Sequence, residues 1–187
     1  NNIQVAITSA VPGATIRVTL NGEEPNPTNG FAYLGPFTLA TTATLRARAF
    51  LDGWIPSPTV TRSYLVNPPA LLRGVPSVFL AGPWNEAWHK PNGVMSIVGG
   101  AWSGGIWYAV SLDDYNIPLK RGRPYERPIS IELFDPASNS VAQTDAGVRI
   151  AGSNHARPRY VLQAMNGTWY GSWTDKPQLN VYFRSMY

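Results

Sequence analysis

The sequence predicts a mainly β protein, with an antiparallel β-sandwich followed by a second β-rich domain. Short runs of alternating apolar and polar residues recur along the chain, as expected for half-buried strands. The 187 residues include 17 Gly and 17 Pro, and pairs such as Asn21-Gly22 and Asp52-Gly53 separate the runs. These pairs favour tight turns. Many short strands joined by turns are typical of a sandwich.

The first domain is expected over residues 1–66. The residue pattern predicts strands at residues 3–8, 14–20, 33–39, 43–50 and 60–65. Two prolines exclude residues 23–30 from a ladder, because proline has no backbone N–H. Within residues 43–50, alternation places Leu45, Ala47 and Ala49 on one face and Arg46 and Arg48 on the other.

A proline-containing linker at residues 67–74 leads to the second domain, residues 75–187. Here residues 75–81 predict a buried strand and residues 105–112 another. Residues 129–134 alternate clearly, which places Glu132 on the polar face of a strand, and residues 147–151 form the next run. Glu126 and Arg127 are expected to form an exposed ion pair where the first of these two strands begins.

Composition excludes several classes of function. The net charge is +4, and no run of five like charges occurs, so a nucleic-acid partner is not predicted. The absence of cysteine excludes disulfides and thiolate metal sites. No apolar run reaches the roughly 20 residues that a membrane span needs.

Tryptophan is the most suggestive residue type in the second domain. Trp84, Trp88 and Trp102 lie close together among glycine-rich turns. Their side chains either stack on sugar rings, which would make them carbohydrate-binding residues, or fill the core of the domain.

Other candidate sites have simpler interpretations. Glu23 and Glu24 are not expected to act as a catalytic pair, because neighbouring side chains point to opposite sides. Asp114, with its neighbour Asp113, is expected in a solvated turn, and His89 is expected as a surface or hydrogen-bonding residue. No residue pattern predicts a catalytic or metal-binding set.

The first domain resembles the chitobiase/β-hexosaminidase C-terminal domain. The resemblance rests on residues 12–28, above all Asn21-Gly-Glu-Glu-Pro-Asn-Pro27, and on Gly35-Pro36, residues 45–54 and Pro56-Ser57. It implies an immunoglobulin-like β-sandwich that serves as an accessory module in large secreted proteins, without catalysis.

The second domain resembles the N-terminal part of the spore coat protein H (CotH) kinase-like family. The matching pieces are residues 75–78, 92–94, 121–135 with Glu126-Arg-Pro128, 145–152 with its Gly-x-Arg-x-x-Gly pattern, and 176–187. The family implies an atypical kinase that uses Mg-ATP, with Arg149 and Gly152 in a nucleotide-side loop and Lys176 as the phosphate-contacting lysine. Its catalytic lobe would follow residue 187, so we expect the second domain to be incomplete.

Three functions therefore stay open at the level of the sequence. The chain is expected to be a structural or adhesive accessory segment of a large secreted or cell-surface bacterial protein. Its partners would be the remainder of the parent polypeptide, other surface or assembly proteins, or glycans, and no cofactor is expected for the segment alone. The alternatives are the N-terminal lobe of a CotH-type kinase that uses Mg-ATP, and a carbohydrate-binding module built on the tryptophans.

Overall fold

The computed structural model describes residues 2–103, 106–137, 140–151, 161–165, 168–172 and 178–184, with the backbone alone for residues 102, 106, 140, 161–165 and 168–172. Strands account for 43% of the chain and helical turns for 9%, which confirms the mainly β fold class. No helix in these ranges is long and apolar enough to cross a membrane.

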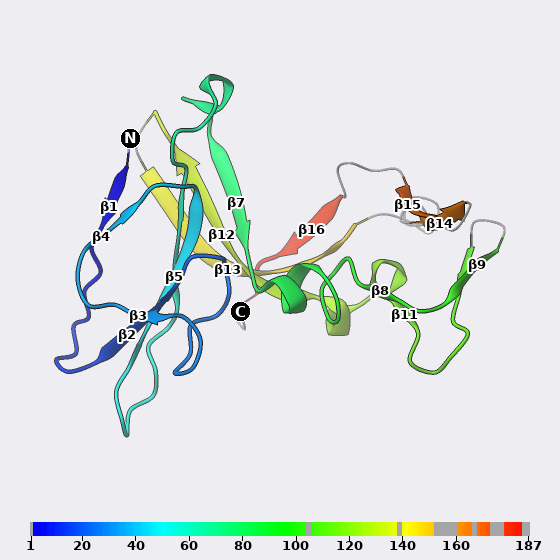
Figure 1. The fold of residues 1–187 in the computed structure, drawn as a ribbon, viewed down its shortest axis with the longest axis horizontal. Coiled ribbons are helices and arrows are strands. Elements are labelled where there is room, and N and C mark those ends of the chain that lie inside the picture. The colour runs from blue at the N-terminus through cyan, green and yellow to red at the C-terminus, as the bar shows by residue number, and fades with distance from the viewer. Residues whose placement is uncertain are drawn as a thin grey trace. The chain divides into compact units, whose positions relative to one another are not determined.

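The chain divides into two compact units, and each unit is made of two separate stretches of the chain. Unit 1 contains Asn1–Pro83 and Ser130–Thr144, and unit 2 contains Trp84–Ile129 and Asp145–Tyr187. The predicted boundaries at residues 66 and 75 stay a prediction. Strands β12 (Arg127–Asp135) and β13 (Ser140–Ile150) contribute residues to both units, in a sheet with the strand order β16-β13-β12-β7 (Figure 1).

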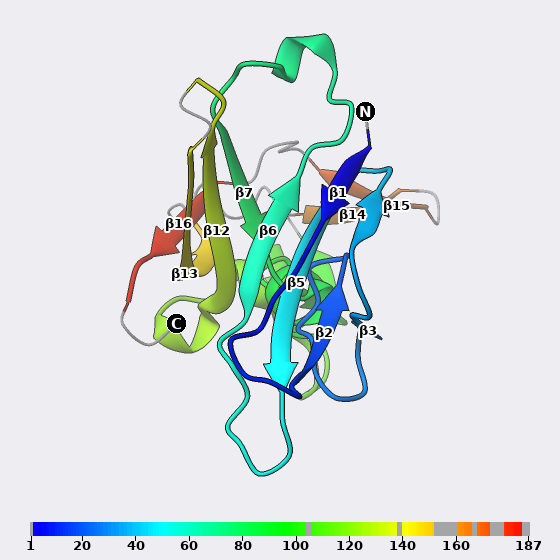
Figure 2. The same cartoon turned by 90° about the vertical axis from the view of Figure 1, so that its left-hand side faces the viewer.

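Unit 1 is built around a β-sandwich. A two-stranded sheet, β1-β4, accompanies a four-stranded antiparallel sheet with the order β3-β2-β5-β6. In Figure 2, β1 crosses in front of β5. The elements are β1 (Ile3–Val5), β2 (Thr15–Thr19), β3 (Phe31–Ala32), β4 (Phe37–Leu39), β5 (Ala43–Phe50), β6 (Val60–Tyr64), the 3₁₀ turn η1 (Ala70–Leu72) and β7 (Ser77–Ala81).

The core of the sandwich confirms the predicted alternation of β5. Leu45 and Ala47 are buried, and Val18 of β2 lies opposite Ala47 and is fully buried. Side chains on directly opposed residues share one face of a sheet, so β2 and β5 form one wall of the core. The buried cluster consists of Val5, Val18, Leu39, Leu45, Ala47 and Val66.

Two predictions about strands in unit 1 are wrong. Residues 33–39 form no single strand: β3 ends at Ala32 and β4 begins at Phe37, because the Gly35-Pro36 pair interrupts the ladder. The strand predicted at residues 75–81 is shorter than expected, Ser77–Ala81, and within it only Ala81 is fully buried. Val78 of β7 is 62% exposed and its partner on β12, Leu133, is 48% exposed, so this strand pair presents one apolar face to solvent.

Unit 2 contains shorter pairs of strands. Its tryptophan-containing π-turn, η2, covers Trp84–Trp88, and the C-terminal half of β13 pairs with β16, where Arg149 is opposite Asn180. The further elements are β8 (Ile97–Val98), β9 (Ala101–Ser103), β10 (Ile106–Tyr108), β11 (Tyr115–Asn116), η3 (Ile117–Leu119), η4 (Arg123–Tyr125), β14 (Val161–Met165), β15 (Thr168–Ser172) and β16 (Leu179–Tyr182).

Candidate functional site

Arg149, the first predicted nucleotide-binding residue, belongs to a cluster around the ring of Tyr182. Its guanidinium donates a hydrogen bond to the Tyr182 hydroxyl and lies 5.1 Å from the ring centroid. The guanidinium of Arg184 lies 5.2 Å from the same centroid. Arg149 Nε is buried and has no hydrogen-bond partner in the described structure. Two cations therefore share one aromatic ring, an arrangement that cation–π attraction stabilises.

Glu126 completes this tyrosine–arginine cluster. Arg184 donates two hydrogen bonds to the Glu126 carboxylate, from Nη2 to Oε1 at 2.9 Å and from Nε to Oε2 at 3.0 Å. Paired donors in one plane match the geometry of a carboxylate, which compensates for burying the Glu126 charge.

The predicted exposed pair of Glu126 and Arg127 is wrong. Glu126 is 8% exposed and pairs with Arg184. Arg127 donates instead to main-chain carbonyls, those of Pro124 (2.9 Å), Glu126 (3.2 Å) and Asn92. A buried carboxylate needs a partner with matched geometry, and Arg184 supplies it from far along the chain.

The other two predicted nucleotide-binding residues, Gly152 and Lys176, lie outside the described residues. Sequence reasoning gave no role to Tyr182 and Arg184. Their spacing held a signal, because residues 180, 182 and 184 alternate as the members of one strand face do. Asn180 also contributes a hydrogen bond to the Tyr182 hydroxyl, at 3.3 Å.

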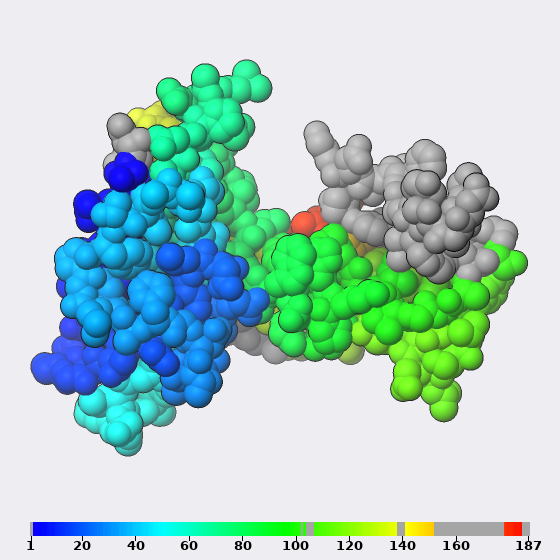
Figure 3. All heavy atoms as spheres, viewed as in Figure 1, coloured from blue at the N-terminus to red at the C-terminus, as the bar shows by residue number. Residues whose placement is uncertain are grey.

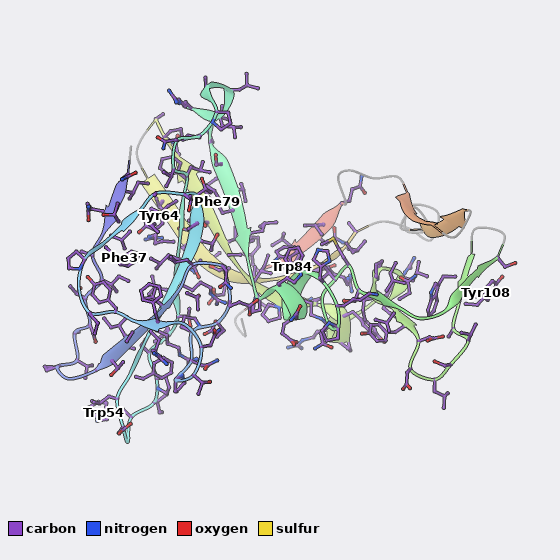
Figure 4. The ribbon with its side chains drawn as sticks, in the orientation of Figure 1. Phe37, Trp54, Tyr64, Phe79, Trp84 and Tyr108 are labelled. Atoms are coloured by element: carbon purple, nitrogen blue, oxygen red, sulfur yellow. The ribbon has the colours of Figure 1, made fainter. Side chains whose placement is uncertain are left out.

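Of the predicted carbohydrate-binding residues, Trp84 has the geometry of a stacking platform. Its side chain is 58% exposed, and the His89 ring stacks on it with centroids 3.9 Å apart and planes 19° apart. The His89 N–H donates to the Trp84 carbonyl across 2.7 Å, which closes the η2 turn. Figure 4 shows Trp84 on this turn. Trp84 therefore does not fill a core.

The described structure does not show Trp88 or Trp102 forming a stacking surface together with Trp84. Trp88, at the end of η2, is half-buried. Trp102 lies on β9 opposite Trp107, and its side chain is outside the described part of the chain. The Trp107 indole donates to the Gly99 carbonyl across 3.2 Å, which fixes that ring against its own turn.

Glu24 in unit 1 has a structural role. Its carboxylate lies 2.7 Å from Arg46 Nη2 and 3.5 Å from Arg48 Nη1, and it accepts a hydrogen bond from the Thr59 hydroxyl. Gly30 ends the loop that carries Glu24. It has φ +86°, and a Cβ there would lie 2.6 Å from the Val18 carbonyl oxygen. Only glycine suits that conformation and that close approach.

Glu132 is buried, so its predicted place on a solvent-facing strand surface is wrong. It is 2% exposed, its Oε1 lies 3.3 Å from Arg62 Nη1, and its Oε2 accepts the Ser63 N–H. Strand β6 is an edge of the four-stranded sheet, so this N–H points away from β5 and needs an acceptor. Glu132 supplies that acceptor from β12.

Asp114 organises a solvated turn, in agreement with the sequence. Its carboxylate accepts the Val110 N–H at 2.7 Å, and both the N–H and the hydroxyl of Ser111, at 2.8 and 2.9 Å. The Val110 hydrogen bond is the main reason that the pKa of Asp114 lies below its usual value. Among the described residues no group of three His, Asp or Glu is placed to hold a metal ion.

Unit 1 also contains a groove that the sequence reasoning did not identify. The cavity has a volume of about 600 Å³, and the residues that line it all lie between Val5 and Tyr64. Its walls are mostly apolar, and the 51–58 loop, which projects from unit 1 in Figure 3, borders it. The sequence did contain a signal for this groove. Val60, Arg62 and Tyr64 alternate along one strand, so one face of that strand carries both apolar and polar side chains.

Unit 1 thus contains a β-sandwich whose acidic residues Glu24 and Glu132 serve its own architecture. Residues 5–64 match the family model described as Fn3 associated, which indicates a fibronectin type III or immunoglobulin-like β domain. No curated protein and no solved structure matches the chain. The prediction that the first domain is an immunoglobulin-like β domain is therefore confirmed. The resemblances to the chitobiase and CotH families stay predictions.

Proposed function

We propose that this chain is a structural or adhesive accessory segment of a large secreted or cell-surface bacterial protein. The match of residues 5–64 to the Fn3 associated family is the observation that carries the proposal, because such domains are typically extracellular. The remainder of the parent polypeptide and other surface proteins are the proposed partners.

An adhesion measurement tests this proposal. Beads coated with the purified chain are expected to retain bacterial cell-wall sacculi above the level of albumin-coated beads, without added nucleotide. Retention equal to that of albumin, or retention only with Mg-ATP, would count against an adhesive accessory role.

A carbohydrate-binding role is the second candidate, and the exposed Trp84–His89 stack favours it. Aromatic faces of this kind pack against the apolar face of a sugar ring. On a glycan array, Trp84→Ala is expected to lose binding. Trp54→Ala is the matched control, because Trp54 is also an exposed tryptophan, at 66%. Equal binding by both variants would exclude the Trp84 platform.

The kinase-lobe alternative rests on the resemblance of residues 75–187 to the CotH family, in which Arg149 belongs to the nucleotide-side loop. Arg149 Nε is buried and has no hydrogen-bond partner among the described residues, so it is a donor that the described contacts do not use. If this alternative holds, calorimetry with Mg-ATP will show binding that Arg149→Gln weakens and Arg17→Gln does not. An absence of heat from the unaltered chain would remove this alternative.

A further inference from the structure

The groove of unit 1 follows the inner face of β6. Val60, Arg62 and Tyr64 are opposite Ala47, Leu45 and Ala43 of β5, so their side chains share the face that carries the core. Residues 6–11 also line the groove, as do Leu51, Trp54, Ile55, Ser57 and Pro58 of the loop that leads to Val60. Figure 4 shows Tyr64 and Trp54 toward opposite ends of unit 1.

Much of the apolar surface at the loop end of this groove is exposed to water. Trp54 is 66% exposed, Ile55 93% and Val60 52%. Apolar surface of this extent is costly in water, and an apolar ligand along the groove would cover part of it. A volume of about 600 Å³ is within the range of pockets that hold small molecules.

Arg62 and Tyr64 of β6 are polar residues that line the groove beyond Val60. Two arginines line the groove, and no acidic residue does. Arg48 belongs to the loop end, because its Nε donates to the Ser57 carbonyl across 2.8 Å, whereas Arg62 lies between Val60 and Tyr64 on β6. The Arg62 side chain is 43% exposed, and in the described structure only its Nη1 contacts Glu132, which leaves Nε and Nη2 as further donors. Both Glu132 oxygens are already engaged, by Arg62 and by the Ser63 N–H.

Tyr64 adds a neutral donor beside Arg62. Burial raises the pKa of its phenol above the ordinary value, the charge of Glu132 acts in the same direction, and that of Arg62 opposes it. The phenol therefore keeps its proton at neutral pH and can donate to an anion. Two donors at one end of an apolar groove complement a ligand with one anionic head and one apolar chain.

We propose that this groove binds a free long-chain carboxylate. The carboxylate accepts hydrogen bonds from Arg62 and Tyr64, and the acyl chain extends along Val60 toward Trp54. Arginine suits this role because its parallel N–H groups match two carboxylate oxygens. The proposal adds a small-molecule ligand to the accessory role and does not depend on it.

The test compares three ligands on the unaltered chain. Dodecanoate, dodecanol and dodecyltrimethylammonium are titrated below their micelle concentrations, with the fluorescence of the chain's tryptophans and calorimetry as readouts. Dodecanoate is expected to bind saturably with one site, at least about tenfold more tightly than either of the others. Equal affinity for dodecanol, or no saturable binding of dodecanoate, would overturn the proposal.

Variants then place the site. Tyr64→Phe is expected to lower the preference for dodecanoate over dodecanol severalfold without changing dodecanol affinity. Ala49→Leu fills the groove and is expected to abolish binding, whereas Ala40→Leu adds the same side chain at an exposed position outside the lining. If Ala40→Leu and Ala49→Leu behaved alike, the ligand would bind elsewhere and the assignment would be wrong.

Discussion

Glu132 in unit 1 and Glu126 in unit 2 are both buried carboxylates paired with an arginine, but the donors around them differ. Glu126 has both oxygens within 3.0 Å of donors on Arg184. Glu132 divides its oxygens between the Arg62 side chain, at 3.3 Å, and the main-chain N–H of Ser63. Glu126 holds Arg184 beside the ring of Tyr182, and Glu132 accepts the N–H of Ser63 at the edge of a sheet.

The difference shows that burying a charge requires enough donors and does not require one fixed kind of partner. For Glu126, the loss of one arginine removes both paired donors. For Glu132, the backbone keeps one hydrogen bond when the arginine is changed, whereas the loss of the carboxylate leaves an edge N–H unsatisfied. The two sites should therefore respond differently to the same substitutions.

The largest effect is expected for Glu132→Ala. It leaves the Ser63 N–H without an acceptor and Arg62 without its counter-charge, so the free energy of unfolding should fall by about 3 kcal/mol. Urea denaturation measures the loss, and hydrogen exchange should show a faster Ser63 amide. Glu132→Gln is the control, since it keeps an acceptor. A loss under about 1 kcal/mol for Glu132→Ala would contradict the edge-capping role.

Arg184→Ala is expected to cost less, about 2 kcal/mol. It leaves the buried Glu126 without its bidentate partner, but the Arg184 side chain that it removes is already 39% exposed to solvent. The same denaturation experiment gives the value. An unchanged midpoint would mean that other contacts of Glu126 satisfy its charge.

Replacing each arginine by lysine distinguishes the Glu126 site from the Glu132 site most directly. Arg184→Lys loses the planar fork and should cost about 1 kcal/mol, whereas Arg62→Lys replaces a single-nitrogen contact and should cost less than about 0.5 kcal/mol. Both variants keep the charge, so each controls for the other. The reverse order of the two losses would refute the distinction between the sites.

The smallest effect concerns pH and Asp114, which is half-buried. Its pKa is lowered in the folded chain, so its contribution to the turn is present above the unfolded value near 3.8 and is lost as pH falls through the folded value. In an NMR titration, the Val110 and Ser111 amide shifts should move together below the ordinary Asp range. Asp114→Asn should abolish this transition. A midpoint above 3.8 would contradict the lowered pKa.

The sequence predicted the fold of the first domain well because local alternation and core burial agree there. Residues 43–50 form β5 with the predicted bounds, and Leu45 and Ala47 are buried as expected. The predicted sites were less complete. Trp84 is exposed and stacked, but Arg149 acts with Tyr182 and Arg184, and those contacts depend on the pairing of β13 with β16.

By itself, the sequence determined most of the segments of the sandwich that become strands, residues 33–39 excepted, because residue alternation, glycine and proline act over a few neighbouring positions. Only the tertiary structure decided which face of β12 is buried. The pattern of residues 129–134 favoured Leu133 inside and Glu132 outside, yet Leu133 is 48% exposed and Glu132 2%. The buried Glu132 carboxylate accepts the Ser63 N–H and pairs with Arg62. These partners lie about 70 residues away in the chain, so a pattern of neighbouring residues does not contain them.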